Sequence, residues 1–365
     1  MKLQASNLAF YSTFDLVNAT HEIYMKRCFE LALKGKFSAA PNPRVGSVII
    51  HEGKIIGEGY HQKYGEAHAE VNAINSVKDK SLLIDSTIYV NLEPCAHFGK
   101  TPPCADLIIQ HKIPRVVIAN IDPFKEVNGG GIARLRKNGV DVLTKVLAKE
   151  GEELNKRFFT FHSKKRPYTI LKWAQTKDGF ISRNTNDPNF ADNWITSQLS
   201  KQLVHTWRAE ETGILVGKNT VVTDNPSLTC REVKGKSPVR IVIDQNLELK
   251  KDFNVFNQEA KTIVFNGKKN ASEGNIEFHQ VDFSSKSIEN ILSKLYELEI
   301  QSLIVEGGAF TLNQFIDSNS WDEARVFTGN KEFGKGLSSP KINLVLIKTE
   351  EIDSDILHIY QNNTK

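Results

Sequence analysis

The stretch from His68 to Cys104 constrains this chain more than any other. It opens with His68-Ala69-Glu70 and contains two cysteines, Cys95 and Cys104, each preceded by a proline. One imidazole and two thiolates make three protein ligands, and a tetrahedral metal held by three protein ligands keeps a fourth position for water. Glu70 is two positions beyond the histidine, close enough to act on that water without binding the metal. The pattern therefore predicts a catalytic zinc site with Glu70 as its acid–base group.

The order His-x-Glu…Pro-Cys…Cys is typical of zinc-dependent deaminases, in which two residues usually separate the cysteines. Here eight residues separate Cys95 from Cys104, which is the informative departure from that pattern. Zinc brings the pKa of water near neutrality, and Glu70 can pass a proton from that water to a departing amine. This chemistry suits hydrolytic loss of ammonia from an amidine carbon in a heterocycle. A metalloprotease is a weaker interpretation because the chain has no His-Glu-x-x-His sequence.

Length and composition bound the other possibilities. A chain of 365 residues points to two or three domains. A net charge of +4 suits a small phosphorylated substrate and gives no sign of a nucleic-acid-binding stripe. Cys28 and Cys230, the cysteines outside the motif, are expected to be reduced thiols. Residues 1–20 lack a signal-peptide pattern, and no apolar run reaches the roughly 20 residues of a membrane span. We therefore expect a cytoplasmic protein with no membrane partner.

Alternating strand and helix patterns predict two α/β domains, one over residues 20–165 and one over 166–365, after an extension of residues 1–19. Glu150–Phe161 reads as one helix, and the basic run His162–Pro167 breaks the pattern, so it marks the expected boundary. Sites are expected at the carboxyl ends of the strands. The strands expected in the first domain are 45–50, 54–59, 87–91 and 116–120; those in the second are 168–174, 213–217, 239–244, 262–265, 302–305, 324–327 and 344–347.

The second half is less explicit chemically. It has no GxGxxG fingerprint, so an ordinary Rossmann cofactor site is not indicated. Its apolar strand Ser302–Val305 runs into Glu306-Gly307-Gly308, ahead of a helix that starts near Ala309. Exposed amides of a glycine turn at a helix N-terminus suit a phosphate group. A plain tight turn is the alternative interpretation.

The motifs of the first half resemble those of the bifunctional riboflavin-biosynthesis deaminase–reductases. The resemblance rests on Pro41-Asn42-Pro43-x-Val45-Gly46, on His68-Ala69-Glu70, and on Pro-Cys-x-His-x-Gly-x-Thr-Pro-Pro-Cys over residues 94–104, where the eight-residue interval is that family's form. It implies that His68, Cys95 and Cys104 hold Zn²⁺ and that Glu70 shuttles protons. It further implies a substrate pocket lined by Asn42, His97, Lys100 and Thr101. Ala96 and Phe124-Lys125-Glu126 depart from the family pattern, which often has a hydroxyl residue and an Asn-Pro pair there.

The second half resembles the reductase half of the same family, which has a dihydrofolate-reductase-like fold and uses NADPH. The substrate contacts implied by this resemblance are Lys172, Arg208, Leu228, Arg231 and Glu306. The implied NADPH contacts are Gln175, Trp194, Thr196, Thr220, Asp224, Gly308, Ala309, Phe310, Thr311, Leu312, Asn313 and Gln314. Two departures bear on this site, because Trp173–Lys177 is bulkier than usual and Arg183–Asn193 is longer.

Taken over both halves, the resemblance implies a cytidine-deaminase-like α/β/α sandwich followed by a dihydrofolate-reductase-like α/β domain. It implies deamination of a phosphoribosylated diaminopyrimidinone and then NADPH-dependent reduction of its ribosyl group to ribityl. A second interpretation is a zinc deaminase acting on RNA with a C-terminal binding module, but the chain shows no basic patch interleaved with aromatic residues. A third is a structural zinc site closed by His97. The sequence leaves open whether the protein is a homo-oligomer.

Overall fold

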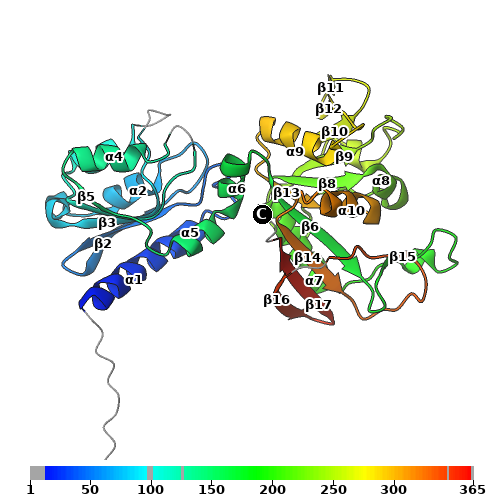
Figure 1. The fold of residues 1–365 in the computed structure, drawn as a ribbon, viewed down its shortest axis with the longest axis horizontal. Coiled ribbons are helices and arrows are strands. Elements are labelled where there is room, and N and C mark those ends of the chain that lie inside the picture. Colours follow the sequence, from blue (N-terminus) through cyan, green and yellow to red (C-terminus); the bar gives the residue numbers. More distant parts are fainter. Residues whose placement is uncertain (1–12, 97–101, 125–126, 343–344, 363–365) are drawn as a thin grey trace, which may run out of the picture. The chain divides into compact units, whose positions relative to one another are not determined.

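In the computed structural model the chain divides into two compact units, Met1–Ser163 and Lys164–Lys365 (Figure 1). The structure describes residues 13–96, 102–124, 127–342 and 345–362. Both units are α/β, as the alternating patterns predicted. Among the described residues, no helix is long and apolar enough to cross a membrane.

The first unit is built on a sheet with strand order β2-β1-β3-β4-β5. Strand β1 pairs antiparallel with β2 and β3, whereas β3, β4 and β5 are parallel. The carboxyl ends of β3 and β4 therefore lie at one edge, where α/β proteins place their sites. The strands are β1 (Gly46–His51), β2 (Lys54–Tyr60), β3 (Thr87–Leu92), β4 (Arg115–Asn120) and β5 (Asp141–Leu143).

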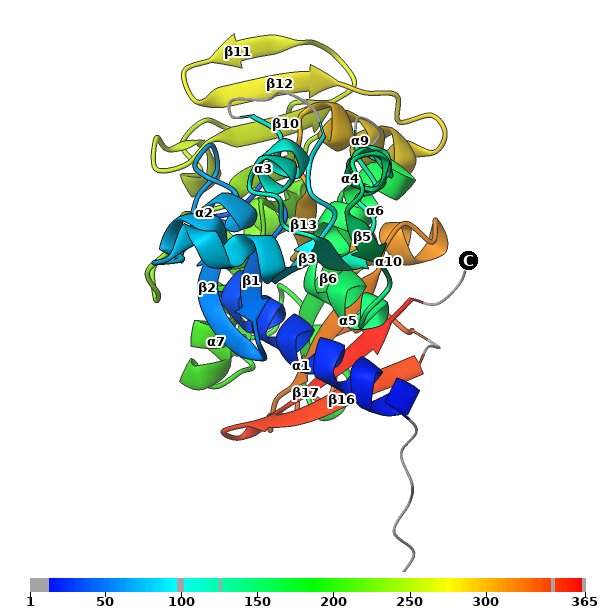
Figure 2. The same ribbon diagram turned by 90° about the vertical axis from the view of Figure 1, so that its left-hand side faces the viewer.

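Helices cover both faces of this sheet, with α2, α3 and α4 on one side and α1 and α5 on the other (Figure 2). Neighbouring strand residues such as Ile88 and Tyr89 point to opposite faces, and both are buried. The strands are therefore apolar on both sides, which confirms the three-layer sandwich. The helices are α1 (Thr13–Leu33), α2 (Ala69–Ser76), η1 (Lys80–Asp85, 3₁₀), α3 (Cys104–Gln110), α4 (Gly130–Lys137), α5 (Ala148–Leu154) and α6 (Lys156–Lys164).

Helical structure differs from the sequence expectation at both ends of this unit. Helix α1 begins at Thr13, inside the segment expected to be an extension. The single helix expected over Glu150–Phe161 is two helices that meet at Asn155. The Asn155 side chain is buried and hydrogen-bonds both backbone polar groups of Arg44, at 2.8 and 2.9 Å. That tertiary contact draws the chain out of helical geometry, an effect local periodicity does not show. Helix α6 also continues to Lys164, through part of the expected break.

The second unit is built on a longer sheet, with strand order β11-β12-β10-β9-β8-β13-β6-β14-β17-β16 among the described residues. Its strands from β12 to β14 are parallel, and β11, β17 and β16 are antiparallel to their neighbours. A separate pair joins β7 and β15. The strands are β6 (Tyr168–Gln175), β7 (Phe180–Ser182), β8 (Gly213–Gly217), β9 (Val239–Ile243), β10 (Thr262–Asn266), β11 (Ala271–Glu273), β12 (Ile276–Gln280), β13 (Ser302–Val305), β14 (Glu323–Thr328), β15 (Leu337–Ser338), β16 (Val345–Ile352) and β17 (Asp355–Gln361).

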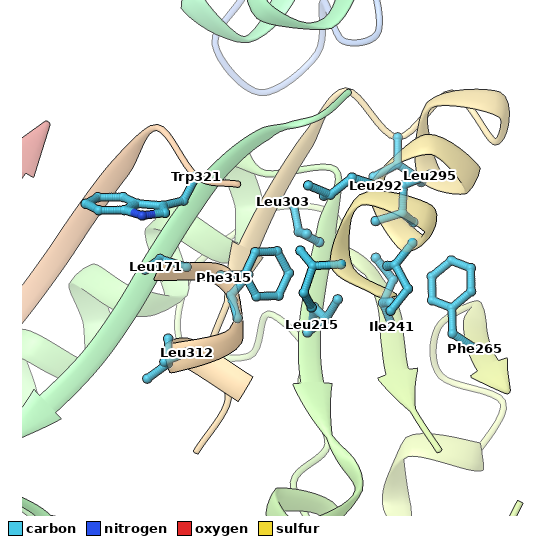
Figure 3. Packing of buried hydrophobic residues seen from close by; sticks show 14 of the residues in the cluster. Leu171, Leu215, Ile241, Phe265, Leu292, Leu295, Leu303, Leu312, Phe315 and Trp321 are labelled. Atoms are coloured by element: carbon cyan, nitrogen blue, oxygen red, sulfur yellow. The ribbon is translucent and has the colours of Figure 1, made fainter. Parts of the chain in front are cut away.

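Two apolar clusters pack on the two faces of this sheet. In Figure 3, Leu292 and Leu295 of α9 and Phe315 of α10 lie beside strand residues such as Leu215 and Leu303. Trp207 of α7 and Val221 of α8 belong to the cluster on the other face. Each such side chain contributes roughly 1.5–3 kcal/mol when it is fully buried. The helices are η2 (Phe190–Asp192, 3₁₀), α7 (Gln198–Glu210), α8 (Lys218–Asp224), η3 (Asn254–Phe256, 3₁₀), α9 (Ser287–Glu297) and α10 (Ala309–Asp317).

Candidate active sites

The three sequence-predicted zinc ligands of the first unit lie together. His68 immediately precedes α2, Cys95 follows β3, and Cys104 begins α3. Nδ1 of His68 lies 3.6 Å from Sγ of Cys95 and 3.3 Å from Sγ of Cys104. All three ligand atoms lie within 4.8 Å of one another. Three elements that are distant in sequence therefore direct one nitrogen and two sulfurs to a single point.

This spacing fits a zinc ion. Zinc bonds of about 2.0 Å to nitrogen and about 2.3 Å to sulfur, at a tetrahedral angle, place nitrogen and sulfur about 3.5 Å apart. The observed separations of 3.6 and 3.3 Å are close to that value. The residues present therefore fit the metal, with Nδ1 of His68 as the ligating nitrogen. His97, Lys100 and Thr101 lie outside the described residues, so their predicted substrate roles and a fourth ligand from His97 stay predictions.

Glu70 lies in the first turn of α2, next to this cluster. The side chain is buried, with 3% of the residue exposed, and it contacts Cys104. Burial raises the pKa of Glu70 to about 7 because desolvation disfavours the charged carboxylate. A carboxyl group that titrates near neutrality can both accept and donate a proton at physiological pH, as an acid–base group requires.

Asn42 reaches the metal cluster through a residue that the sequence analysis missed. Its Nδ2 lies 3.0 Å from Nε2 of His61, and Nδ1 of His61 lies 3.1 Å from the carbonyl oxygen of Ala67. The His61 ring also meets the His68 ring edge-on, with centroids 5.7 Å apart. The signal for His61 was weak, since it is a single histidine just after the expected strand that ends near Gly59.

Glu93 is a second residue that the sequence analysis missed. Its buried carboxylate accepts hydrogen bonds from the backbone N–H groups of Asp122, Gly129 and Ile132, at 3.2, 2.9 and 3.0 Å. Glu93 therefore fastens the end of β3, just before Pro94 and Cys95, to the start of α4. The available signal was a lone acidic residue at the end of an apolar strand.

In the second unit, Glu306 is the centre of a buried charge cluster. Arg208 of α7 donates from Nε and Nη2 to the two carboxylate oxygens of Glu306, at 3.0 and 2.8 Å. Lys172 of β6 lies 3.7 Å from the same carboxylate, because β6 and β13 are paired neighbours. Burial alone would raise the pKa of Glu306, but the two cations outweigh it and hold that pKa at about 2. Burial lowers the pKa of Lys172, and Glu306 opposes this effect. Three predicted substrate contacts are thus brought together.

The predicted phosphate turn lies beside this cluster, where the carboxyl ends of β8 and β13 are adjacent. The amide of Gly308 donates to the Thr220 hydroxyl at 3.1 Å. Gly307 allows the turn to pack tightly, since a methyl group there would lie 2.8 Å from Cβ of Thr311. Thr220, Gly308 and Thr311, all predicted NADPH contacts, therefore share one corner of the unit. Thr220 lies on α8, a helix that the sequence analysis did not predict.

The other residues predicted for this unit lie in different surroundings. The side chains of Leu228 and Leu312 belong to the two apolar clusters, so only their backbone groups are left for a ligand. Trp194 is largely exposed and donates from its ring nitrogen to the Thr196 carbonyl at 2.6 Å. Burial raises the pKa of Asp224, at the end of α8. Gln175 donates to the Thr328 hydroxyl, and Arg231 donates to the Thr229 hydroxyl. Phe310 and Asn313 are exposed, Ala309 is buried, and Gln314 is half-buried.

Comparison with known proteins supports both halves. Residues 18–120 match the family described as cytidine and deoxycytidylate deaminase zinc-binding region, and residues 167–358 match the RibD C-terminal domain. A riboflavin biosynthesis protein RibD from Aquifex aeolicus is 45% identical over 86% of this chain and 88% of its own length. The chain belongs to the RibD family.

Solved structures agree with this membership. A crystal structure from Thermotoga maritima, described as a diaminohydroxyphosphoribosylaminopyrimidine deaminase/5-amino-6-(5-phosphoribosylamino)uracil reductase, matches with a TM-score of 0.84. It is 38% identical, over 94% of this chain and 99% of that one. Acinetobacter baumannii RibD matches with a TM-score of 0.85 at 26% identity, over 95% of this chain and 100% of that one. Like other RibD proteins, this chain joins a zinc deaminase domain to a reductase domain that uses NADPH, and the RNA-deaminase interpretation is not favoured.

Proposed function

We propose that the first unit deaminates 2,5-diamino-6-(5-phosphoribosylamino)pyrimidin-4-one and that the second reduces the ribosyl group of the product to ribityl. The observation that carries this proposal is the convergence of His68, Cys95 and Cys104 on one point beside the buried carboxyl group of Glu70. The substrate class is taken from the Thermotoga maritima protein, which resembles this chain over nearly its full length.

In the first unit, Glu70 carries the proton transfers. A zinc ion held by the three ligands would leave one position for water and bring the pKa of that water near neutrality. Glu70 accepts a proton as water attacks the ring carbon that bears the amino group, and it donates a proton to that amino group as ammonia leaves. Asn42 and His61 hydrogen-bond each other beside this point, so they orient the pyrimidine ring.

In the second unit, the charge cluster holds the substrate while the glycine turn holds the cofactor. Glu306 occupies two N–H groups of Arg208, which fixes the guanidinium, and Arg231 lies close by because both arginines donate to Thr229. Two guanidinium groups suit a phosphoribosyl phosphate. The turn at Gly307 and Gly308, at the N-terminus of α10, would hold a phosphate of NADPH. When bound, NADPH would supply the hydride for reduction of the ribosyl group.

The direct test is incubation of the zinc-loaded protein with the phosphoribosyl diaminopyrimidinone, with and without NADPH, followed by mass spectrometry of the products. Without NADPH the deaminated compound should accumulate, about one mass unit heavier because NH is replaced by O. With NADPH the mass should rise by two hydrogens more. Failure to release ammonia from this compound by a zinc-loaded protein would exclude the proposed substrate.

A further inference from the structure

The long interval between the two cysteines raises a question about how the zinc site is held together. Cys95 and Cys104 are separated by eight residues, whereas two residues usually separate the cysteines of such a site. The entropic cost of bringing chain ends together grows with the length between them. Contacts that hold the two ends of the interval together offset this cost.

Part of this restraint comes from the backbone of α3. The amide of Cys104 donates to Sγ of Cys95 at 3.3 Å, and the amide of Ala105 donates to the carbonyl oxygen of Cys95 at 3.1 Å. Both bonds link residues at the two ends of the interval directly. Neither explains why the segment after Cys95 keeps its place against α3.

Helix α4 packs directly on the segment that carries Cys95. A methyl group at Gly131 would lie 1.9 Å from the carbonyl oxygen of Pro94, so this approach requires glycine there. Three residues after Gly131, Arg134 donates from Nη1 to the carbonyl oxygen of Ala96 at 3.1 Å. Its Nε lies 2.6 Å from Oδ1 of Asp106, in the first turn of α3. One guanidinium thus joins the residue after Cys95 to the helix that begins at Cys104.

We propose that Arg134 is a positioning residue of the zinc centre, holding together the two segments that carry Cys95 and Cys104. Its two partners among the described residues, the Ala96 carbonyl and the Asp106 carboxylate, are not metal ligands, so its effect reaches the metal through the spacing of the two sulfurs. The planar guanidinium suits this task because it offers several donors in a fixed arrangement, whereas a lysine ammonium would not hold two acceptors in the same geometry.

The expected size of the effect follows from exposure. Mutation of residues that do not bind the metal but orient its ligands typically lowers metal affinity 10- to 100-fold. The Arg134 and Asp106 side chains are 40% and 30% exposed, and exposed ion pairs are weakened by solvent. We therefore expect the low end of that range, about a tenfold loss of zinc affinity.

The test compares Arg134→Met with Arg136→Met, a matched arginine of the same helix that donates to the Val142 carbonyl instead. Zinc affinity is measured on the full-length protein by competition with a chromogenic chelator at fixed pH. Arg134→Met should bind zinc about tenfold more weakly, and its Co²⁺-substituted form should show altered absorption bands. Arg136→Met should match the wild type in both. With excess chelator, the two variants should melt at the same temperature, because the role concerns the metal.

Asp106→Asn provides an independent arm, in case Arg134→Met does not fold. It should weaken zinc binding in the same direction. Zinc affinity within twofold of the wild type in both Arg134→Met and Asp106→Asn would overturn the inference. The inference rests on the proposed zinc site, so zinc binding by the wild type is measured first and serves as the reference for the variants. A wild type that binds no stoichiometric zinc would overturn the proposed function as well, whereas unchanged variants of a zinc-binding wild type overturn this inference alone.

Discussion

Arg208 and Glu306 meet through two hydrogen bonds of 3.0 and 2.8 Å, although 98 positions separate them in sequence. Their side chains are only 14% and 10% exposed. A bidentate, largely buried pair of this kind fixes both side chains, and losing one partner leaves the other charge buried. The pair therefore holds the proposed substrate site of the reductase unit more rigidly than either residue could alone.

Replacing Arg208 by alanine should abolish efficient reduction while ammonia release continues. Loss of a charge-assisted phosphate contact costs about 1.5–3 kcal/mol, or roughly ten- to a hundred-fold in affinity. The measurement is NADPH oxidation with supplied deaminated intermediate, alongside ammonia release from the diaminopyrimidinone. Arg208→Lys, which keeps the charge but loses the two-pronged geometry, should fall between alanine and wild type. Equal reduction by Arg208→Ala and wild type would remove Arg208 from the site.

The low pKa of Glu306, about 2, makes the second unit sensitive to acid. The usual pKa of a glutamate, which applies in the unfolded state, is 4.5. Between about pH 2 and pH 4.5 the folded state therefore binds fewer protons than the unfolded state. The stabilising contribution is therefore complete above about pH 5 and is lost as pH falls, by about 2 kcal/mol at pH 3. Glu306→Gln should be less stable at pH 6 but should lose correspondingly less on going to pH 3.

Tryptophan fluorescence can isolate this effect, because all four tryptophans lie after residue 172, in the second unit. Urea unfolding followed by this signal at pH 6 and pH 3 gives the two stabilities. Exposed Glu332→Gln is the matched control and should follow the wild type. A parallel pH dependence in wild type and Glu306→Gln would contradict the ion-pair argument.

Glu70→Gln should keep zinc but lose deamination by at least about 10²-fold, the usual scale for a general acid–base group. The amide keeps the size of the carboxyl group, so the fold and the metal ligands stay in place. Ammonia release and zinc content are measured on the same sample. Glu66→Gln, an exposed neighbour just before α2, should behave as wild type. Normal ammonia release by zinc-loaded Glu70→Gln would refute the assignment.

Cys95→Ser and Cys104→Ser should each lose zinc and deaminase activity, because both thiolates converge on His68. Since a cysteine thiol must lose its proton to bind zinc, zinc affinity should also weaken as pH falls. Cys230→Ser and Cys28→Ala should retain the metal, with alanine chosen for Cys28 because that side chain is buried in the core. Unchanged zinc content in Cys104→Ser would mean that the eight-residue interval is not part of the site.

The sequence predicted what residue type and order determine, and it missed what depends on contacts across the fold. His68, Cys95 and Cys104 were found because few residue types bind zinc. His61 and Glu93 were missed because their partners are up to 39 positions away. The same applies to the helix break at Asn155, which depends on Arg44. Helix α8 was missed because it is short and its β-branched Thr220, Val221, Val222 and Thr223 have low helix propensity.

The two activities should be physically separable between the units. The first unit needs α6 at least through His162, whose ring packs against Phe158 and Phe124. The second needs to begin no later than Arg166, which pairs with buried Asp322 at 2.5 and 2.8 Å. Both requirements are met by fragments 1–165 and 166–365, each well over 100 residues and long enough to form its own core.

Fragment 1–165 should therefore release ammonia without NADPH, and fragment 166–365 should reduce supplied intermediate without zinc. In the intact protein, a zinc chelator should block deamination and spare reduction, the reverse of Arg208→Ala. Starting the second fragment at Pro167 is the control, because it removes Arg166 and leaves Asp322 without that partner, so this fragment should melt at a lower temperature. If chelation stops both reactions while tryptophan fluorescence shows that the second unit stays folded, one shared site fits better than two. The charge cluster around Glu306 would then need another role.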